Sequence, residues 1–219
     1  SEILAIGIPA SVNMLLMSIA SGLLNGMAAS YGDKVVAAWG IVGRTASMAF
    51  MIVLGLSVGY QPLAGYSFGA KNYGRLMEAF KTNALIGTGI SLFFTALFQI
   101  FPEGIISVFI KDMEVVNTGA VIMRANVIAL PLLGIMMTFM TTFQSMGKAI
   151  QSLIISLGRQ GIFFIPTALV FNKVFGFNGL VFAQPIADIM NFFVALVLFL
   201  RIRRGLGLKK TMTDSLQPE

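Results

Sequence analysis

Residues 179–200 read GLVFAQPIADIMNFFVALVLFL and contain one ionisable side chain, Asp188. About 20 mainly apolar residues are the length that crosses the hydrocarbon core of a bilayer as an α-helix. An open strand edge in lipid would leave backbone groups unpaired, and the stretch does not show the period-2 alternation of a membrane barrel. It therefore predicts a membrane-spanning helix.

Five similar apolar runs precede this stretch. They cover roughly residues 3–29, 36–61, 77–100, 116–143 and 149–171. Together the runs predict an all-α integral membrane protein, with a six-helix transmembrane bundle over residues 1–201. A polar cytoplasmic tail is expected at 202–219. A short interfacial helix is expected at 102–110, where apolar residues alternate with polar ones.

The composition argues against several classes of function. Hydrophobic residues make up 57% of the chain and charged residues 11%, with a mean hydropathy of +0.87, whereas soluble proteins carry roughly 25% charged residues. There is no Cys and no His, so the chain lacks thiolates, the commonest metal ligand and the usual acid or base at neutral pH. We expect no enzyme activity, no cofactor and no metal site.

The distribution of basic residues predicts an orientation in the membrane. A net charge of +6 is typical of a membrane protein that keeps Lys and Arg on the cytoplasmic side, and we expect no nucleic-acid partner. Loops after the second, fourth and sixth runs hold ten Lys or Arg residues, against three in the opposite loops. The ten are Lys71, Arg75, Lys81, Lys148, Arg159, Arg201, Arg203, Arg204, Lys209 and Lys210, and the three are Lys34, Lys111 and Lys173. We expect a multi-pass protein of the cell inner (plasma) membrane with both ends cytoplasmic. The chain starts at Ser1 without a basic leader, so we also expect it to begin partway through a longer gene product.

Asp188 is the main candidate for a binding residue. It lies about nine residues into its run, near mid-membrane at about 1.5 Å per residue, where an ionisable group is costly and therefore a functional hypothesis. Gln184 and Asn191 share its helical face, and Pro185 would kink the helix. One interpretation is a carboxylate that binds H⁺, Na⁺ or a cationic substrate.

The other interpretation of Asp188 is a permanent ion pair with Arg44 or Arg124. Both arginines lie inside predicted spans, the second and the fourth. Each can also extend its long side chain toward the outer interface, and we favour that explanation for both. The role of Asp188 stays open between binding and structural pairing.

Polar side chains also form stripes on two other spans. In the fourth span Thr138, Thr141, Thr142 and Ser145 lie on one helical face, and in the first span Ser11, Ser18 and Asn25 repeat every seven residues. Thr138, Thr142 and Asn25 are the candidate ligands among them. These side chains could line a wet cavity, although hydrogen bonding to a neighbouring helix or to their own backbone is the commoner role.

The region between the second and third spans has the most specific pattern. Residues 59–75 read GYQPLAGYSFGAKNYGR, whose glycines and proline predict a structured loop and whose cations place it on the cytoplasmic side. It is not a phosphate-binding loop, because GxxxxGK[ST] does not occur in the chain.

This region resembles the loop after the second helix of each half of multidrug and toxic compound extrusion (MATE) transporters. The matching positions are Gln61, Pro62, Gly65, Gly69 and Ala70. Residues 159–166, RQGIFFIP, are similar to the penultimate helix of the carboxy-terminal half. With them the resemblance extends over nearly the whole chain.

The resemblance implies one lobe of a twelve-helix transporter in the lipid bilayer, whose partner is a missing amino-terminal six-helix lobe. It implies secondary active multidrug efflux, in which cationic amphiphilic small molecules leave in antiport with H⁺ or Na⁺. In many relatives a principal coupling carboxylate lies in the first lobe, and other branches use acids in helices that correspond to the first and fourth spans here. Those spans hold no Asp or Glu beyond Glu2, so Asp188 is a candidate by elimination.

Two other functions remain open on the sequence. A flippase for lipid-linked saccharides shares the lobe architecture, but it needs several cations facing anionic headgroups, and the spans offer Arg44 and Arg124. A non-transporting scaffold subunit would instead turn its polar stripes toward other helices.

Overall fold

The computed structural model describes residues 2–205, with side chains for residues 15–148 and 150–202. Its helices are α1 (Glu2–Ala29), α2 (Asp33–Gly69), α3 (Tyr73–Ile100), α4 (Pro102–Ser107), α5 (Met113–Asn126), α6 (Leu130–Ser145), α7 (Ala149–Leu157) and α8 (Phe164–Gly205), with a 3₁₀ turn η1 (Val127–Ala129) and a π-helical segment η2 (Gly158–Ile162). The predicted tail lies outside the described residues from 206 onward. Within residues 2–205 the secondary structure is all helical, so the predicted fold class is confirmed.

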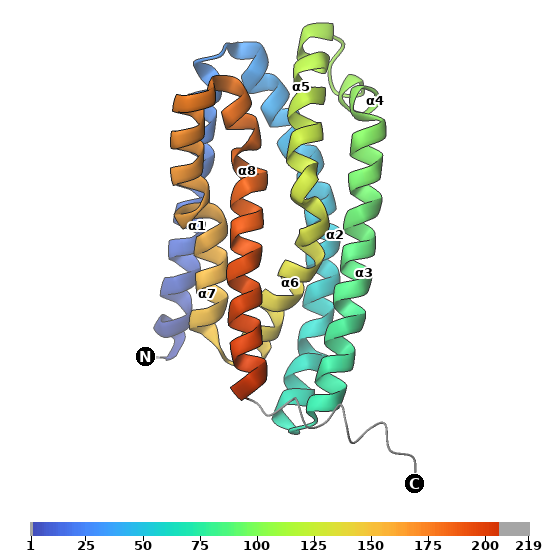
Figure 1. Cartoon of the computed structure of the whole chain (residues 1–219), viewed down its shortest axis with the longest axis vertical. Helices are drawn as coiled ribbons and strands as arrows, with labels where there is room; N and C mark the ends of the chain where they lie inside the picture. The colour runs from blue at the N-terminus through green and yellow to red at the C-terminus, as the bar shows by residue number, and fades with distance from the viewer. Residues whose placement is uncertain (1, 206–219) are drawn as a thin grey trace.

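The long helices run side by side along one axis (Figure 1). The α1–α2 turn, α4 and the start of α5 lie at the upper end, whereas α1 begins and α8 ends at the lower end. Four helical segments among the described residues are long and apolar enough to cross a membrane: Asp33–Gly69, Tyr73–Ile100, Met113–Ser145 and Ile150–Ile202. Leu15–Ala29 in α1 is a shorter apolar helix.

Helix α1 and the division of Ile150–Ile202 at Gly176 bring the number of crossings over residues 2–205 to six, and two of the six are composite. The first consists of α5, η1 and α6, and Pro131 in the first turn of α6 suits its 3₁₀ junction with η1. The second consists of α7, η2 and α8 as far as residue 175. At Gly176 the backbone leaves helical geometry, with φ 59° and ψ −137°, and residues 177–205 return toward the lower end. A positive φ of this kind is tolerated by glycine.

Helix α2 is longer than the sequence predicts. The sequence predicts that the second span ends near residue 61 and that a loop follows, but the helix continues to Gly69 with Pro62 inside it. The prediction of a loop over residues 59–69 is therefore wrong. Tertiary contacts explain the extension: the Ser145 hydroxyl donates to the Gln61 carbonyl at 3.1 Å, and the Gln61 amide donates to Gln144 at 2.7 Å.

The turn after α2 is short and well specified. Lys71 has a φ of 56°, and the amides of residues 70–72 donate to carbonyls of the last helical turn. The Asn72 side chain then accepts from the Arg75 amide at 3.1 Å and caps α3. The tight backbone predicted for this region is thus confined to residues 70–72.

The backbones of α3 and α6 are in close contact where the two helices cross. A Cβ placed on Gly134 would lie 2.2 Å from the Gly87 carbonyl carbon, so the two backbones leave no room for a side chain. Below this crossing the rings of Phe80, Phe139 and Phe199 join α3, α6 and α8, with centroids 4.6–5.5 Å apart. These contacts pack α3, α6 and α8 against one another.

Candidate functional site

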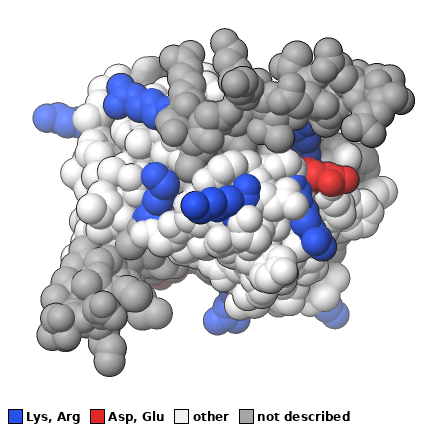
Figure 2. Space-filling view, turned by 90° about the horizontal axis from the view of Figure 1, so that it is seen from below, with Lys and Arg blue, Asp and Glu red and all other residues white. Residues whose placement is uncertain are grey.

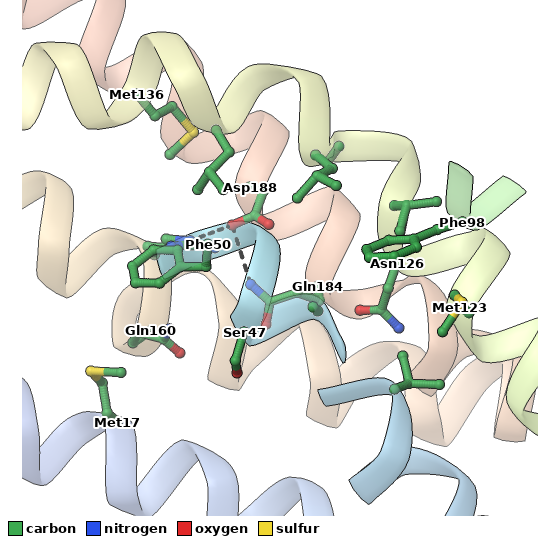
Figure 3. Close-up of a pocket in the computed structure, with 17 residues that line it drawn as sticks. Met17, Ser47, Phe50, Phe98, Met123, Asn126, Met136, Gln160, Gln184 and Asp188 are labelled. Atoms are coloured by element: carbon green, nitrogen blue, oxygen red, sulfur yellow. Dashed lines mark hydrogen bonds and ion pairs between the residues drawn. The ribbon is translucent and has the colours of Figure 1, made fainter. Parts of the chain in front are cut away.

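Asp188 forms an ion pair with Arg159 inside the bundle. The Arg159 Nε donates to Asp188 Oδ1 at 3.0 Å, and the Gln184 amide donates to the same oxygen at 3.2 Å. The side chains of Arg159 and Asp188 are 20% and 14% exposed, which places the pair well inside the protein surface. The hydrogen bond between Asp188 and Gln184 is visible in Figure 3.

This pairing corrects two predictions. The charge pattern predicts Arg159 in a cytoplasmic loop, but Arg159 lies in η2 within a crossing. The suggested partners Arg44 and Arg124 are also wrong: Arg124 donates to Glu103 near the upper end at 2.8 Å, and Arg44 is exposed. The contact of Arg124 with Glu103 agrees with the expectation that Arg124 extends toward an interface.

The π-helical segment η2 positions Arg159. π-Helical turns inside α-helices occur mostly as single bulges and frequently at functional sites. Gly158 brings this segment against α8, since a Cβ there would lie 2.5 Å from the Asn191 Oδ1, and Gly161 packs against Leu16 of α1. The Arg159 guanidinium carbon then lies 5.3 Å from the centroid of the Phe50 ring on α2. The segment therefore joins three helices around one cation.

A cavity of about 230 Å³ opens beside this pair. Its walls come from α1, α2, α3, α5, η1, α6, η2 and α8, and most of the lining is apolar, with thioethers and aromatic rings (Figure 3). The apolar residues labelled there are Met17, Phe50, Phe98, Met123 and Met136. Ser47, Asn126 and Gln160 add neutral polar groups to the lining. Flexible Met side chains and aromatic faces suit lipophilic cations of varied shape.

The structure brings only part of the predicted ligand set to this cavity. Asp188 and Gln184 line it, whereas Asn25 is exposed on α1 and is not among its lining residues. Asn191 is completely buried, and its amide has no hydrogen-bond partner among the described residues. A ligand role for Asn191 and Asn25 stays a prediction.

The hydroxyls on α6 hold helices together. Thr138 accepts from Asn83 of α3 at 2.9 Å and donates to the Gly134 carbonyl, while Thr142 lies 3.0 Å from the Tyr60 hydroxyl of α2. Both threonines are buried and neither lines the cavity. The contacts match the commoner role that the sequence left open, helix-to-helix hydrogen bonding.

Sequence reasoning missed Arg159 and Phe50 as parts of the site. The position of Arg159, about ten residues into the predicted span 149–171, is a usable signal, because this corresponds to roughly 15 Å of helix. Phe50 gives no such signal, since the chain has 19 Phe residues.

The two ends of the bundle differ in charge. Viewed from below, Lys and Arg are spread over the lower end with few acidic groups among them (Figure 2). The lower turns contribute Lys71, Arg75 and Lys148. At the upper end, Lys34 pairs instead with Asp112 and Glu114. This asymmetry is the pattern on which the predicted orientation depends.

Residues 9–170 match the MatE family model. The chain belongs to the MatE family. The resemblance noted at residues 59–75 is thereby confirmed, and the chain is a multi-pass membrane protein. The family match ends before Asp188, so the role of that residue depends on the structure.

Curated relatives in the family are multidrug exporters. The chain is 29% identical over 205 residues to the multidrug export protein MepA of Staphylococcus aureus (strain MSSA476), and 28% identical over 212 residues to MepA of Staphylococcus haemolyticus (strain JCSC1435). These alignments cover 93% and 95% of the chain but 45% and 46% of the relatives. The chain spans about half the length of the curated relatives it matches.

Solved MATE structures share the fold over the same fraction. The MATE multidrug transporter DinF-BH is 35% identical with a TM-score of 0.81, and the match covers 92% of this chain and 46% of that one. The Vibrio cholerae MATE transporter VcmN in its bent form is 23% identical with a TM-score of 0.85, and the match covers 94% and 47%. The VcmN comparison shows the fold alone. The MATE half-transporter fold is therefore established for this chain.

Proposed function

We propose that this chain forms one six-helix lobe of a twelve-helix secondary active transporter that exports cationic organic compounds in antiport with H⁺ or Na⁺. Family membership and relatives named as multidrug exporters support the class. The chain's match to 45% of MepA supports a second lobe as its partner. We propose that both ends of the chain are cytoplasmic, on the side of the basic lower end where α1 begins and α8 ends, and that the protein lies in the inner (plasma) membrane.

The observation that carries the proposal is the carboxylate in the apolar cavity. Asp188 is the one acidic residue among the residues that line the cavity, and it lies among thioethers and aromatic rings. A lipophilic cation that reaches this carboxylate in place of Arg159 gains from all three groups, through charge, polarizability and ring faces. With Asp188 available to a ligand, a cavity of this composition favours such cations over anions.

Coupling to an ion gradient follows from differential affinity. H⁺ or Na⁺ and the exported cation would compete for the same carboxylate. Whichever of them binds one conformation better shifts the balance between inward-open and outward-open states. Asp188 is the group we assign to this competition.

The test is ethidium efflux from vesicles that contain the complete transporter, under an imposed H⁺ or Na⁺ gradient. Asp188→Asn should lower efflux at least about tenfold, since it removes a charge-assisted interaction worth roughly 1.5–3 kcal/mol. Glu103→Gln is the matched control, because Glu103 is a carboxylate paired with an arginine near the upper end and does not line the cavity. Unchanged efflux and ion dependence in Asp188→Asn would remove Asp188 from the mechanism.

The other two functions gain less support. A saccharide-lipid flippase needs free cations in its cavity, and the one cation among the described lining residues, Arg159, is paired with Asp188. The scaffold function agrees with the buried hydrogen bond that the Thr138 side chain of α6 makes with α3. It does not account for a cavity lined by a carboxylate.

A further inference from the structure

The Asp188 carboxylate is already paired with a cation that belongs to the chain. The Arg159 guanidinium lies between Asp188 and Phe50, with Nε 3.0 Å from the carboxylate and Cζ 5.3 Å from the ring centroid. A guanidinium is planar and delocalised, pairs with carboxylates and stacks on aromatic faces. A carboxylate beside an aromatic face is also what a flat organic cation needs in a pocket. The Arg159 guanidinium therefore makes the same two contacts here that a flat organic cation would make, one with the carboxylate and one with the ring face.

We propose that Asp188 and Phe50 form a subsite for planar monovalent organic cations, and that Arg159 is the internal competitor that a substrate must displace. The inference rests on the proposed function and deepens it. Arg159 becomes a specificity-determining residue: an uncharged ligand cannot replace it at the carboxylate, whereas a flat cation replaces both of its contacts.

The geometry permits the displacement. Among the described residues Arg159 makes one hydrogen bond to Asp188, through Nε, and a single bond is weaker than the two parallel bonds of a bidentate pair. Its side chain is 20% exposed and lines the cavity, so the guanidinium can turn toward the open volume without unfolding η2. Gln160 on the same segment lines the cavity as well and offers an acceptor for the displaced group.

The cavity walls around the pair suit a flat ring system. Met17 and Met136 line the same cavity as Phe50, and flexible thioethers adjust to the outline of an aromatic ligand. With Arg159 in place, the charges of the pair cancel, and a cation gains little until the guanidinium leaves. Release of Arg159 would turn this neutral wall into an anionic one.

The test measures ethidium binding to the assembled transporter in detergent by fluorescence anisotropy, for the wild type, Arg159→Ala and Arg159→Lys. Ethidium is a planar monovalent cation. Arg159→Ala should lower its Kd about tenfold, because a charge-assisted hydrogen bond no longer competes. Arg159→Lys keeps the charge but loses the planar group that stacks on Phe50, so its Kd should lie between those of the wild type and Arg159→Ala. Free guanidinium ion at millimolar concentration should raise the Kd of Arg159→Ala toward the wild-type value.

Phenanthridine as a second probe and Phe50→Leu as a second variant test the proposal independently. Phenanthridine is the uncharged parent ring of ethidium. If Arg159→Ala lowers the Kd of phenanthridine as much as the Kd of ethidium, Arg159 does not compete through its charge and the proposal is rejected. An ethidium Kd in Arg159→Ala at or above that of the wild type would overturn the subsite. If Arg159→Ala does not fold, Phe50→Leu leaves the ion pair intact and should raise the ethidium Kd about threefold through loss of the ring face. An unchanged Kd in Phe50→Leu would then reject the subsite.

Failure of this inference is separable from failure of the proposed function. Ethidium efflux by the wild type, with no response of binding to these variants, would leave transport standing and remove the subsite. Absence of efflux under both ion gradients would count against the transport function itself.

Discussion

At the upper end, single charged residues tie the α1–α2 turn to the start of α5. Lys34 pairs with Asp112 at 3.7 Å and also with Glu114. The backbone amide of Glu114 donates to Asp112 at 2.9 Å and lowers the pKa of that carboxyl, and the charge of Lys34 lowers it further. All three side chains are well exposed to solvent, so their contacts are sensitive to pH and salt.

The lowered pKa of Asp112 predicts the pH range over which this tie holds. A carboxyl whose pKa is lower in the folded state stabilises the fold above the ordinary value of 3.8, and the contribution is lost as pH falls through the folded-state pKa. Hydrogen exchange of residues 113–118, corrected for its intrinsic pH dependence, should therefore show more frequent opening as pH falls below 3.8.

Two variants separate the causes of this acid response. Asp112→Asn should remove it, because an amide side chain still caps α5 but does not titrate. Lys34→Gln should only weaken it, since the backbone amide of Glu114 is the larger cause of the lowered pKa. Identical profiles for the wild type and Asp112→Asn would contradict the assignment.

At the scale of helices, the α3–α6 crossing sets the position of the α6 cavity wall. Gly134 has no space for a Cβ, because Gly87 and the Thr88 amide lie 2.2 and 2.3 Å from where it would be. The crossing also carries the buried bond between Asn83 and Thr138. Any side chain at residue 134 must push the two helices apart and break this bond.

Gly134→Ala should therefore destabilise the protein by at least about 1–3 kcal/mol, as overpacking does when backbone cannot yield. Thermal unfolding in detergent, followed by circular dichroism, measures the change. Gly89→Ala is the matched control on α3, since a Cβ there meets nothing within 4 Å and the substitution favours helix. A melting temperature for Gly134→Ala equal to that of Gly89→Ala would show that the crossing is looser than described.

For the whole molecule, sequence predicts the crossings better than it predicts the site. Apolar length alone indicates a spanning helix, because lipid imposes the same requirement on every crossing. The partner of Asp188 depends instead on how each helix is rotated about its axis. The π-helical turn that directs Arg159 has only Gly158 and Gly161 as local signals. Likewise, Pro62 and Gly65 predict a loop, and only the contacts of Gln61 with α6 explain why the helix continues.

Access of water to the cavity separates a transporter from a scaffold. The chain has no native Cys, so a single introduced thiol is the only one this lobe can offer to a water-soluble reagent. Ser47→Cys lies on the cavity wall and should react in vesicles, and ethidium should slow the reaction. Thr138→Cys is the control, because its side chain is 0% exposed and lies between α3 and α6. Labelling at neither position would mean that α2 packs against dry helices, as a scaffold requires. Labelling at residue 47 that ethidium does not slow would mean a wet cavity without a cation site.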